Sequence, residues 1–184
     1  MTKQVAIVCS HCRQENRDNA RFCSQCGRSL ATLSTPPTSK PAPVEICLLY
    51  SQTDEDLKQS FLKHMAVLGR AERAIVWHDR DIQAGDDLNQ QVDRRLASAP
   101  IILMLISADF IASDYCYSDK MEIAMKRQEK GEARVIPLII RPVDWEETPF
   151  HKLKALPTNL KPVSKWHCED EAWLEIVQGI KAIL

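Results

Sequence analysis

The chain has 184 residues, a formal net charge of −1 and 45% hydrophobic residues. This length accommodates one ordinary domain with a small appendage, and the near-neutral charge argues against nucleic acid as a partner. No apolar run approaches the ~20 residues that cross a bilayer, so no membrane contact is expected, and the five scattered glycines exclude a glycine-rich phosphate loop.

Residues 1–30 contain four cysteines in two CxxC pairs. These are Cys9, Cys12, Cys23 and Cys26, with ten residues between the pairs. Each CxxC turn offers two thiolates to a tetrahedral metal, and the stretch CSHCRQENRDNARFCSQCGRSL resembles a zinc ribbon. A redox pair or two disulfides is the alternative, but without a secretion signal the thiols are expected to stay reduced, in the cytoplasm. A ribbon this small has almost no core, so a structural Zn²⁺ is predicted to supply its folding free energy.

The ribbon carries five basic and two acidic side chains and is therefore only weakly basic. A spacing or docking role, with an unidentified protein partner, fits it better than a grip on nucleic acid. Residues 31–43, ATLSTPPTSKPAP, hold four prolines and predict an extended linker. A second domain is expected to occupy residues 44–184.

In this second domain apolar strands alternate with amphipathic helices. Strands are predicted over residues 44–51, 74–77, 100–107 and 134–140, with a short fifth strand near 163–166. Helical patterns begin near residues 55, 88, 114 and 173. Strands that are apolar on both faces and separated by helices predict a flavodoxin-like, five-stranded parallel sheet with strand order 2-1-3-4-5.

That strand order predicts where a site should lie. Ligands bind at the carboxyl ends of the strands, at the point where the order reverses. The segments that reach this rim are Tyr50-Ser51, residues 77–85 and residues 107–117. We therefore expect any site to be built from these three segments.

The same three segments carry a family resemblance. LLYSQTDED resembles the first box of Toll/interleukin-receptor (TIR) domains, WHDRDIQAGDDL resembles the loop after their second strand, and LISADFIASDYCYSDKMEIAMKRQEKGEARVIPLIIRPVDW resembles the third strand, third helix and fourth strand of bacterial TIR proteins. The resemblance covers residues 44–184. It implies the flavodoxin-like fold, self-association through that loop and, in many members, cleavage of NAD at the nicotinamide–ribose bond.

The resemblance also implies roles for particular residues. Those expected to line an NAD cleft are Tyr50, Ser51, Trp77, Arg80, Gly85 and Tyr115. Catalytic members need a glutamate three or four residues after the cysteine that corresponds to Cys116, but this chain has Asp119 and Lys120 there. Its first glutamate is Glu122, which makes Glu122 the predicted catalytic carboxylate and Asp119 its substitute. Helical geometry places Lys120 at the border of the sheet-facing side and both acids further out.

Two functions stay open from the sequence. The first is a signalling or defence effector that cleaves NAD when its TIR domains assemble. The second is a catalytically silent adaptor that binds other TIR domains through residues 78–87. Two smaller alternatives also stay open: Trp77 either stacks on a nucleotide or belongs to the core, and the aspartates of the loop either bind a divalent cation or begin a helix. These aspartates are Asp79, Asp81, Asp86 and Asp87.

Overall fold

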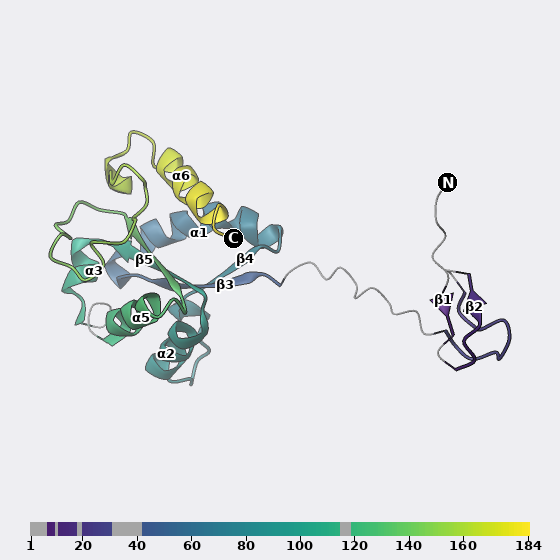
Figure 1. Ribbon diagram of the computed structural model, residues 1–184. Coiled ribbons are helices and arrows are strands. Elements are labelled where there is room, and N and C mark those ends of the chain that lie inside the picture. The colour runs from purple at the N-terminus through teal and green to yellow at the C-terminus, as the bar shows by residue number, and fades with distance from the viewer. Residues whose placement is uncertain (1–6, 10, 18–19, 31–41, 115–118) are drawn as a thin grey trace. The chain divides into compact units, whose positions relative to one another are not determined.

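The structure is a computed structural model that describes residues 7–9, 11–17, 20–30, 42–114 and 119–184. The chain divides into two compact units, residues 1–41 and residues 42–184 (Figure 1). In the described part of the chain, every helix is too short or too polar to span a bilayer.

The smaller unit is built from two similar turns and one short hairpin. Strand β1 (Ile7–Val8) pairs antiparallel with β2 (Glu15–Asn16). In each turn the residue after the second cysteine donates to the first: the N–H of Arg13 to the carbonyl of Cys9 at 2.9 Å, and that of Gly27 to Cys23 at 3.0 Å. Both donors have a left-handed backbone, with φ of 60° and 67°. Glycine adopts this conformation freely, whereas an arginine must be held in it by the surrounding structure.

The larger unit contains an open parallel sheet. Its strands are β3 (Val44–Leu49), β4 (Ala74–Trp77), β5 (Ile101–Ile106) and β6 (Arg134–Ile139), in the order β4-β3-β5-β6. Cys47 lies opposite Trp77 on one side and Ile102 on the other, which fixes the register of the central strands. The prediction of a flavodoxin-like sheet, with its first and third strands adjacent at the centre, is confirmed.

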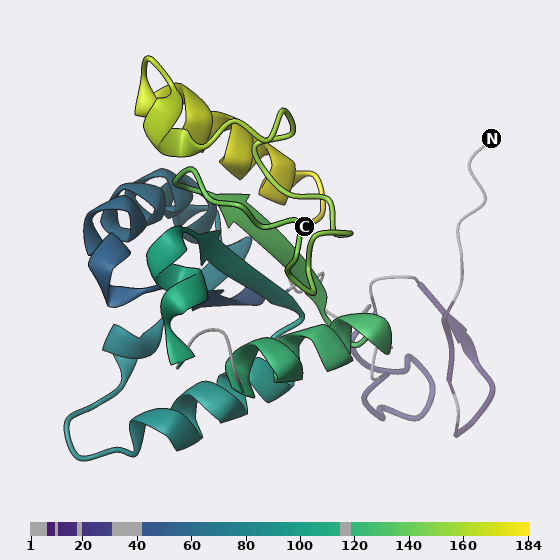
Figure 2. The same ribbon diagram turned by 90° about the vertical axis from the view of Figure 1, so that its left-hand side faces the viewer.

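Helices cover both faces of this sheet (Figures 1 and 2). Helices α1 (Glu55–Arg70) and α6 (Glu169–Lys181) pack together on one face, and α2 (Leu88–Ser98) and α5 (Asp119–Glu129) pack together on the other. Each pair buries its own apolar cluster, because alternate side chains of the strands point to opposite faces. Tyr50 belongs to the cluster under α1, and Trp77 packs against the cluster under α2.

The prediction of a fifth strand near residues 163–166 is wrong. Residues Val163–Lys165 form a 3₁₀ helix, η3, in which Val163 is fully buried. Of the residues that the structure describes, only Leu156 pairs with the free edge of β6, as an isolated parallel bridge to Leu138. Along this edge Pro137 has no N–H, and the N–H of Val135 donates to the side chain of Gln128 at 2.7 Å. The edge therefore offers few free N–H donors to another strand. The sheet that the structure describes has four strands.

The structure adds a helix ahead of the third predicted one. A short helix, α3 (Ala108–Ala112), follows β5 directly, with Ser107 as its N-cap: the hydroxyl of Ser107 accepts from the N–H of Phe110 at 3.0 Å. Helix α5 then occupies the later part of the predicted span. Residues 115–118 lie outside the described residues, so the predicted positions of Tyr115 and Cys116 have no structural account.

Candidate functional site

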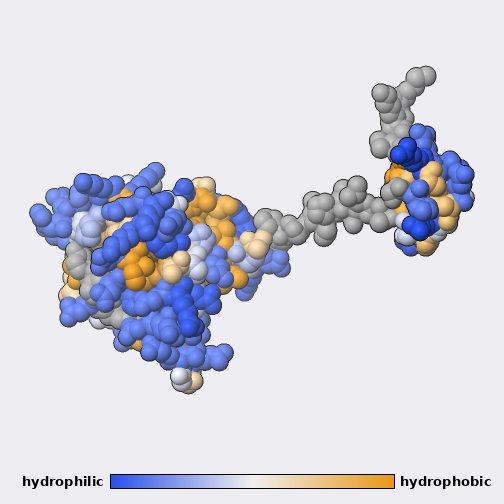
Figure 3. Space-filling model, turned by 60° about the horizontal axis from the view of Figure 1, so that its bottom comes forward, coloured by the Kyte–Doolittle hydropathy of each residue, from blue (hydrophilic) through white to orange (hydrophobic). Residues whose placement is uncertain are grey.

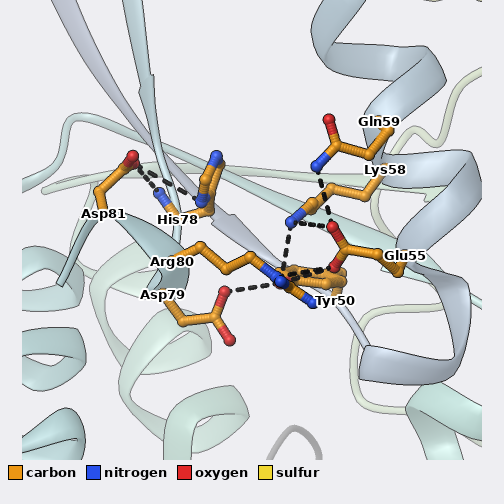
Figure 4. Close-up of polar contacts among 8 residues, drawn as sticks. All are labelled: Tyr50, Glu55, Lys58, Gln59, His78, Asp79, Arg80 and Asp81. Atoms are coloured by element: carbon orange, nitrogen blue, oxygen red, sulfur yellow. Dashed lines mark hydrogen bonds and ion pairs between the residues drawn. The ribbon is translucent and has the colours of Figure 1, made fainter. Parts of the chain in front are cut away.

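A cluster of polar side chains joins the end of β3 to the loop that follows β4 (Figure 4). The hydroxyl of Tyr50 donates to Asp79 at 2.6 Å and accepts from the ammonium of Lys58 at 3.0 Å. Lys58 is fully buried, lies 4.4 Å from the centre of the Tyr50 ring and pairs with Glu55 at 2.9 Å. Arg80, from the loop, pairs with the other oxygen of Glu55 at 3.2 Å. The cluster holds the start of the loop against α1.

The electrostatics of this cluster keep its acid charged and its phenol neutral. Burial raises the pKa of Tyr50, and the neighbouring carboxylate of Asp79 raises it further. Burial also acts to raise the pKa of Glu55, but hydrogen bonds from Gln59 and Lys58, with the charges of Lys58 and Arg80, outweigh it and lower this pKa to about 2. Arg80 therefore ties the loop to a carboxylate that Lys58, on the same helix as Glu55, helps to keep charged.

Replacing Glu55 by Gln is expected to weaken the larger unit in a pH-dependent way. Because the folded-state pKa of Glu55 lies below its ordinary value of 4.5, its contribution is present above pH 4.5 and is lost as the pH falls toward 2. At pH 7 we expect Glu55→Gln to lose about 1 kcal/mol of unfolding free energy, a value reduced for partial exposure to solvent. The difference from the natural chain should close between pH 4.5 and pH 2.

Urea unfolding followed by tryptophan fluorescence checks this. All four tryptophans belong to the larger unit, so the signal reports that unit alone. Asp56→Asn, at the next residue, is the control because Asp56 lies outside the cluster. Parallel stability curves for Glu55→Gln and the natural chain from pH 7 to pH 3 would contradict the assignment.

A second polar group ties three strand ends together. Asp54, fully buried at the N-terminus of α1, accepts from the hydroxyl of Ser107 at 2.5 Å and pairs with Arg141 at 2.8 Å. These residues follow β3, β5 and β6. Burial raises the pKa of Asp54, while the hydrogen bond from Ser107 and the charge of Arg141 oppose that rise. The group fixes the carboxyl edge of the sheet on the side of α1.

The predicted cleft residues do not all meet. Tyr50 and Arg80 lie together. Ser51, the residue after Tyr50, is buried, and its carbonyl accepts from the N–H of Asp54 at 2.8 Å. Trp77 lies on the opposite face of the sheet, where the guanidinium of Arg95 sits 5.6 Å from its ring centre. This placement agrees with the core alternative for Trp77.

The loop after β4 has a fixed start and an exposed remainder. Gly85 has φ of 100°, a conformation that side chains rarely adopt, although a Cβ there would meet no atom within 4 Å. The four aspartates have separate partners. Asp79 binds Tyr50, and Asp81 accepts from the N–H of His78 at 3.0 Å. Asp86 accepts from the side-chain amide of Gln91 at 3.4 Å, and Asp87 caps α2 through the N–H of Gln90. Among the described residues they form no group able to hold a cation.

Helix α5 presents a lysine, not a carboxylate, inward. Lys120 is 5% exposed and forms an ion pair with Asp93 of α2. Glu122 is 63% exposed and pairs with Lys126 at 2.5 Å on the same helix. That pairing lowers the pKa of Glu122, and Asp119 is also exposed. The outward direction predicted for both acids agrees with this arrangement.

The four cysteines of the smaller unit converge on one point. Their sulfur atoms lie within 4.8 Å of one another, with 3.7 Å between Cys9 and Cys26 and 3.4 Å between Cys12 and Cys23. Tetrahedral zinc with bonds of about 2.3 Å separates its sulfur ligands by roughly 3.8 Å, so the set fits the metal. Backbone N–H groups in the second turn, from Cys26 first and then Gln25, lower the pKa of Cys23 to about 6, which favours the thiolate that zinc binds.

These two units define a class of protein: a parallel α/β domain with a charge-held loop at its carboxyl edge, combined with a four-cysteine metal ribbon. Residues 46–176 match the family model described as the TIR domain, and residues 8–30 match that of the zinc-ribbon domain. The chain therefore belongs to the TIR-domain family.

Parts of the chain are similar to individual known proteins. An uncharacterized protein, y4lF, of Sinorhizobium fredii is 45% identical over 132 residues, which are 72% of this chain and 41% of that protein. The chain thus spans less than half the length of this relative. The TIR domain of the Toll-related receptor TRR-2 of Hydra magnipapillata aligns with a TM-score of 0.54 at 15% identity, over 74% of this chain and 97% of that one. The TIR domains of the activated Roq1 resistosome, which recognises the pathogen effector XopQ, align with a TM-score of 0.53 at 14% identity. This alignment covers 74% of this chain and 99% of that one.

Several residues of the site were not predicted from the sequence. Much of the two polar groups is built from four residues that look like ordinary helix-start or loop residues in the sequence. These are Asp54, Glu55, Lys58 and Arg141. One signal was available: Asp54, Ser107 and Arg141 each follow a predicted strand, so parallel topology brings them to one edge.

Proposed function

We propose that this chain is a self-assembling TIR module that does not cleave NAD. The observation that carries the proposal is the position of Lys120. Where catalytic members need a glutamate, this chain buries a cation and neutralises it with Asp93.

The chemistry of NAD cleavage explains why this substitution matters. The ribose becomes positively charged as the bond to nicotinamide breaks, and an enzyme stabilises that charge with a nearby carboxylate. A buried ammonium in the same place would repel the positive charge that develops on the ribose. Glu122 is paired with Lys126 and mostly exposed to solvent, where a carboxylate gives little stabilisation.

Assembly needs two complementary surfaces, and the first is the exposed part of the loop after β4. Residues 83–88 are all exposed, and Leu88 presents 44% of its surface to solvent. Asp86 and Asp87 make this segment acidic. The face seen in Figure 3 is largely hydrophilic with separate hydrophobic patches. Leu88 places a partly exposed apolar side chain directly beside these two acids.

The second surface is an apolar groove beside β6, with a volume of about 430 Å³. Its floor is aliphatic, from Val135, Leu153, Leu156 and Ile183, and its charged lining residues are Arg134 and Lys154 alone. An acidic segment with one exposed leucine complements a basic groove with an apolar floor. We infer that the loop of one copy docks into the groove of the next.

The positions of the two surfaces set the type of assembly. The loop follows β4 at one edge of the sheet, and the groove flanks β6 at the other edge. A contact between different surfaces is heterologous, so it adds copies head to tail and forms rings or open filaments.

Charge exchange between the two surfaces tests the proposal. We expect Asp86→Lys alone and Arg134→Glu alone each to remain monomeric at concentrations where the natural chain assembles, as measured by sedimentation velocity. An equimolar mixture of the two variants should assemble again, because each junction then pairs opposite charges. Lys63→Glu, an exposed charge reversal on α1, is the control and should assemble normally. Assembly of both single variants would refute docking of the loop into the groove.

NAD cleavage is the second candidate, and one observation favours it. Tyr50, Arg80 and Glu55 meet at the carboxyl edge, where a nucleotide is expected to bind. The assembled natural chain is incubated with NAD and free nicotinamide is measured, beside Glu122→Gln and Asp119→Asn. Absence of nicotinamide supports the non-catalytic module. Release that either substitution abolishes would establish the enzyme, and release that both leave intact would establish it with a different catalytic group.

A further inference from the structure

Asn16, in the second strand of the zinc ribbon, uses its complete hydrogen-bonding capacity beside the metal ligands. It is 7% exposed. Its amide oxygen accepts from the backbone N–H of Ser24 at 2.8 Å and from the hydroxyl of Ser24 at 3.0 Å. Its amide nitrogen donates to the carbonyl of Gln14 at 2.8 Å and to the sulfur of Cys23 at 3.7 Å. A primary amide has two acceptor positions and two donors, so none is left over.

This pattern fixes which way the amide faces. The backbone N–H of Ser24 can only donate, so the oxygen of Asn16 must face it. The nitrogen therefore points to the carbonyl of Gln14 and to the sulfur of Cys23. The N–H of Gln25, 3.5 Å away, is a second donor to the same sulfur.

A donor facing a metal-bound thiolate has two effects. It withdraws negative charge from a sulfur that shares one cation with three other thiolates, and it fixes the direction of that sulfur before the metal arrives. Asn16 lies on β2, whereas Ser24 and Cys23 belong to the second CxxC turn. One side chain thus joins the hairpin to the turn that supplies two of the four ligands.

We propose that Asn16 is a positioning residue of the zinc site, acting on the sulfur of Cys23. It touches no metal itself. Its hydrogen bond to the sulfur slows zinc release and tightens zinc binding, separately from the bonds that it makes to Ser24. This role depends on the ribbon alone and not on TIR assembly or NAD.

Two substitutions separate the sulfur contact from the Ser24 contacts. Asn16→Ala removes both. Asn16→Asp keeps acceptors for Ser24 but faces Cys23, and the carbonyl of Gln14, with an oxygen that cannot donate. Glu15→Gln, at the exposed neighbouring position, is the matched control. All are made in the full chain, and zinc transfer to a chromophoric chelator is timed at pH 7.5.

We expect both Asn16 variants to bind zinc roughly 10- to 100-fold more weakly than the natural chain, with Glu15→Gln unchanged. With Co²⁺ in place of zinc, the thiolate-to-metal absorption band should move to lower energy in both variants, because a sulfur without its donor gives up electrons more readily. Complete loss of metal from both Asn16 variants would count against the role, because Asn16→Asp also loses the bond to the carbonyl of Gln14 and the loss would then reflect the fold of the hairpin.

The proposal is overturned if Asn16→Asp matches the natural chain in zinc affinity and in the Co²⁺ band. In that case Ser24 is the important partner, and Asn16 serves only the fold of the ribbon. Equal loss in Glu15→Gln would also overturn it, because the effect would then belong to the strand and not to the amide.

Discussion

Removing zinc, or replacing Cys23 by Ser, is expected to unfold the ribbon and to leave the TIR domain folded. Metal binding in small ribbons contributes about 10–16 kcal/mol, whereas the apolar cluster that the described residues of this unit form has just Cys9, Cys23 and Leu30 as buried members. Without metal, that cluster cannot offset the entropy of ordering the chain. Amide hydrogen exchange should show residues 7–30 losing protection. The melting temperature of the larger unit, followed by tryptophan fluorescence, should stay unchanged.

Cys168→Ser provides the control for this experiment. Cys168 is partly exposed at the start of α6, far along the chain from the ribbon, so this variant should still bind one zinc ion per chain. Retained amide protection in residues 7–30 after complete chelation would show that the ribbon folds without metal.

Replacing Arg127 by Met is expected to cost the TIR domain about 3 kcal/mol of unfolding free energy. The guanidinium donates to carbonyls at the C-terminal end of α2, those of Leu96 at 2.6 Å and of the C-cap residue Ala99 at 2.7 Å, and to that of Glu132 at 3.0 Å. Methionine preserves the apolar stem but leaves carbonyls at a buried helix end without a donor. Urea unfolding followed by tryptophan fluorescence measures the loss.

The neighbouring residue supplies the comparison. Lys126 is 63% exposed and makes only a pair with Glu122 among the interactions described, so Lys126→Met should leave the stability nearly unchanged. Arg127→Lys should recover part of the loss, because an ammonium reaches fewer of the three carbonyls. Equal effects at positions 126 and 127 would mean that Arg127 does not cap α2.

The elements predicted well are those with a repeated local signal. Strands such as Ile101–Ile106 are apolar at every position, and the two CxxC pairs have a spacing that few other structures require. Such patterns depend on neighbours in the chain, which makes them readable before any contact is known.

The features that sequence reasoning missed depend on distant partners. The pairing of Asp54 with Ser107 spans 53 positions, and nothing near Lys120 points to Asp93 on another helix. The false fifth strand had a similar origin. Val163 and Trp166 are apolar as strand residues are, but their burial comes from packing beside α6, and the free edge of β6 is occupied by Leu156 and Gln128.

The occupied edge of β6 bears on how copies of the chain behave when crowded. A bare edge strand invites a neighbour to pair with it, and such pairing grows into continuous sheets that rarely come apart. Here the outward N–H groups from Val135 to Ile139 are all accounted for: Val135 donates to the side chain of Gln128, Pro137 has no N–H, and Ile139 donates to the carbonyl of Leu156. If copies assemble as proposed, the occupied edge leaves them to associate through side chains, and such contacts can separate again.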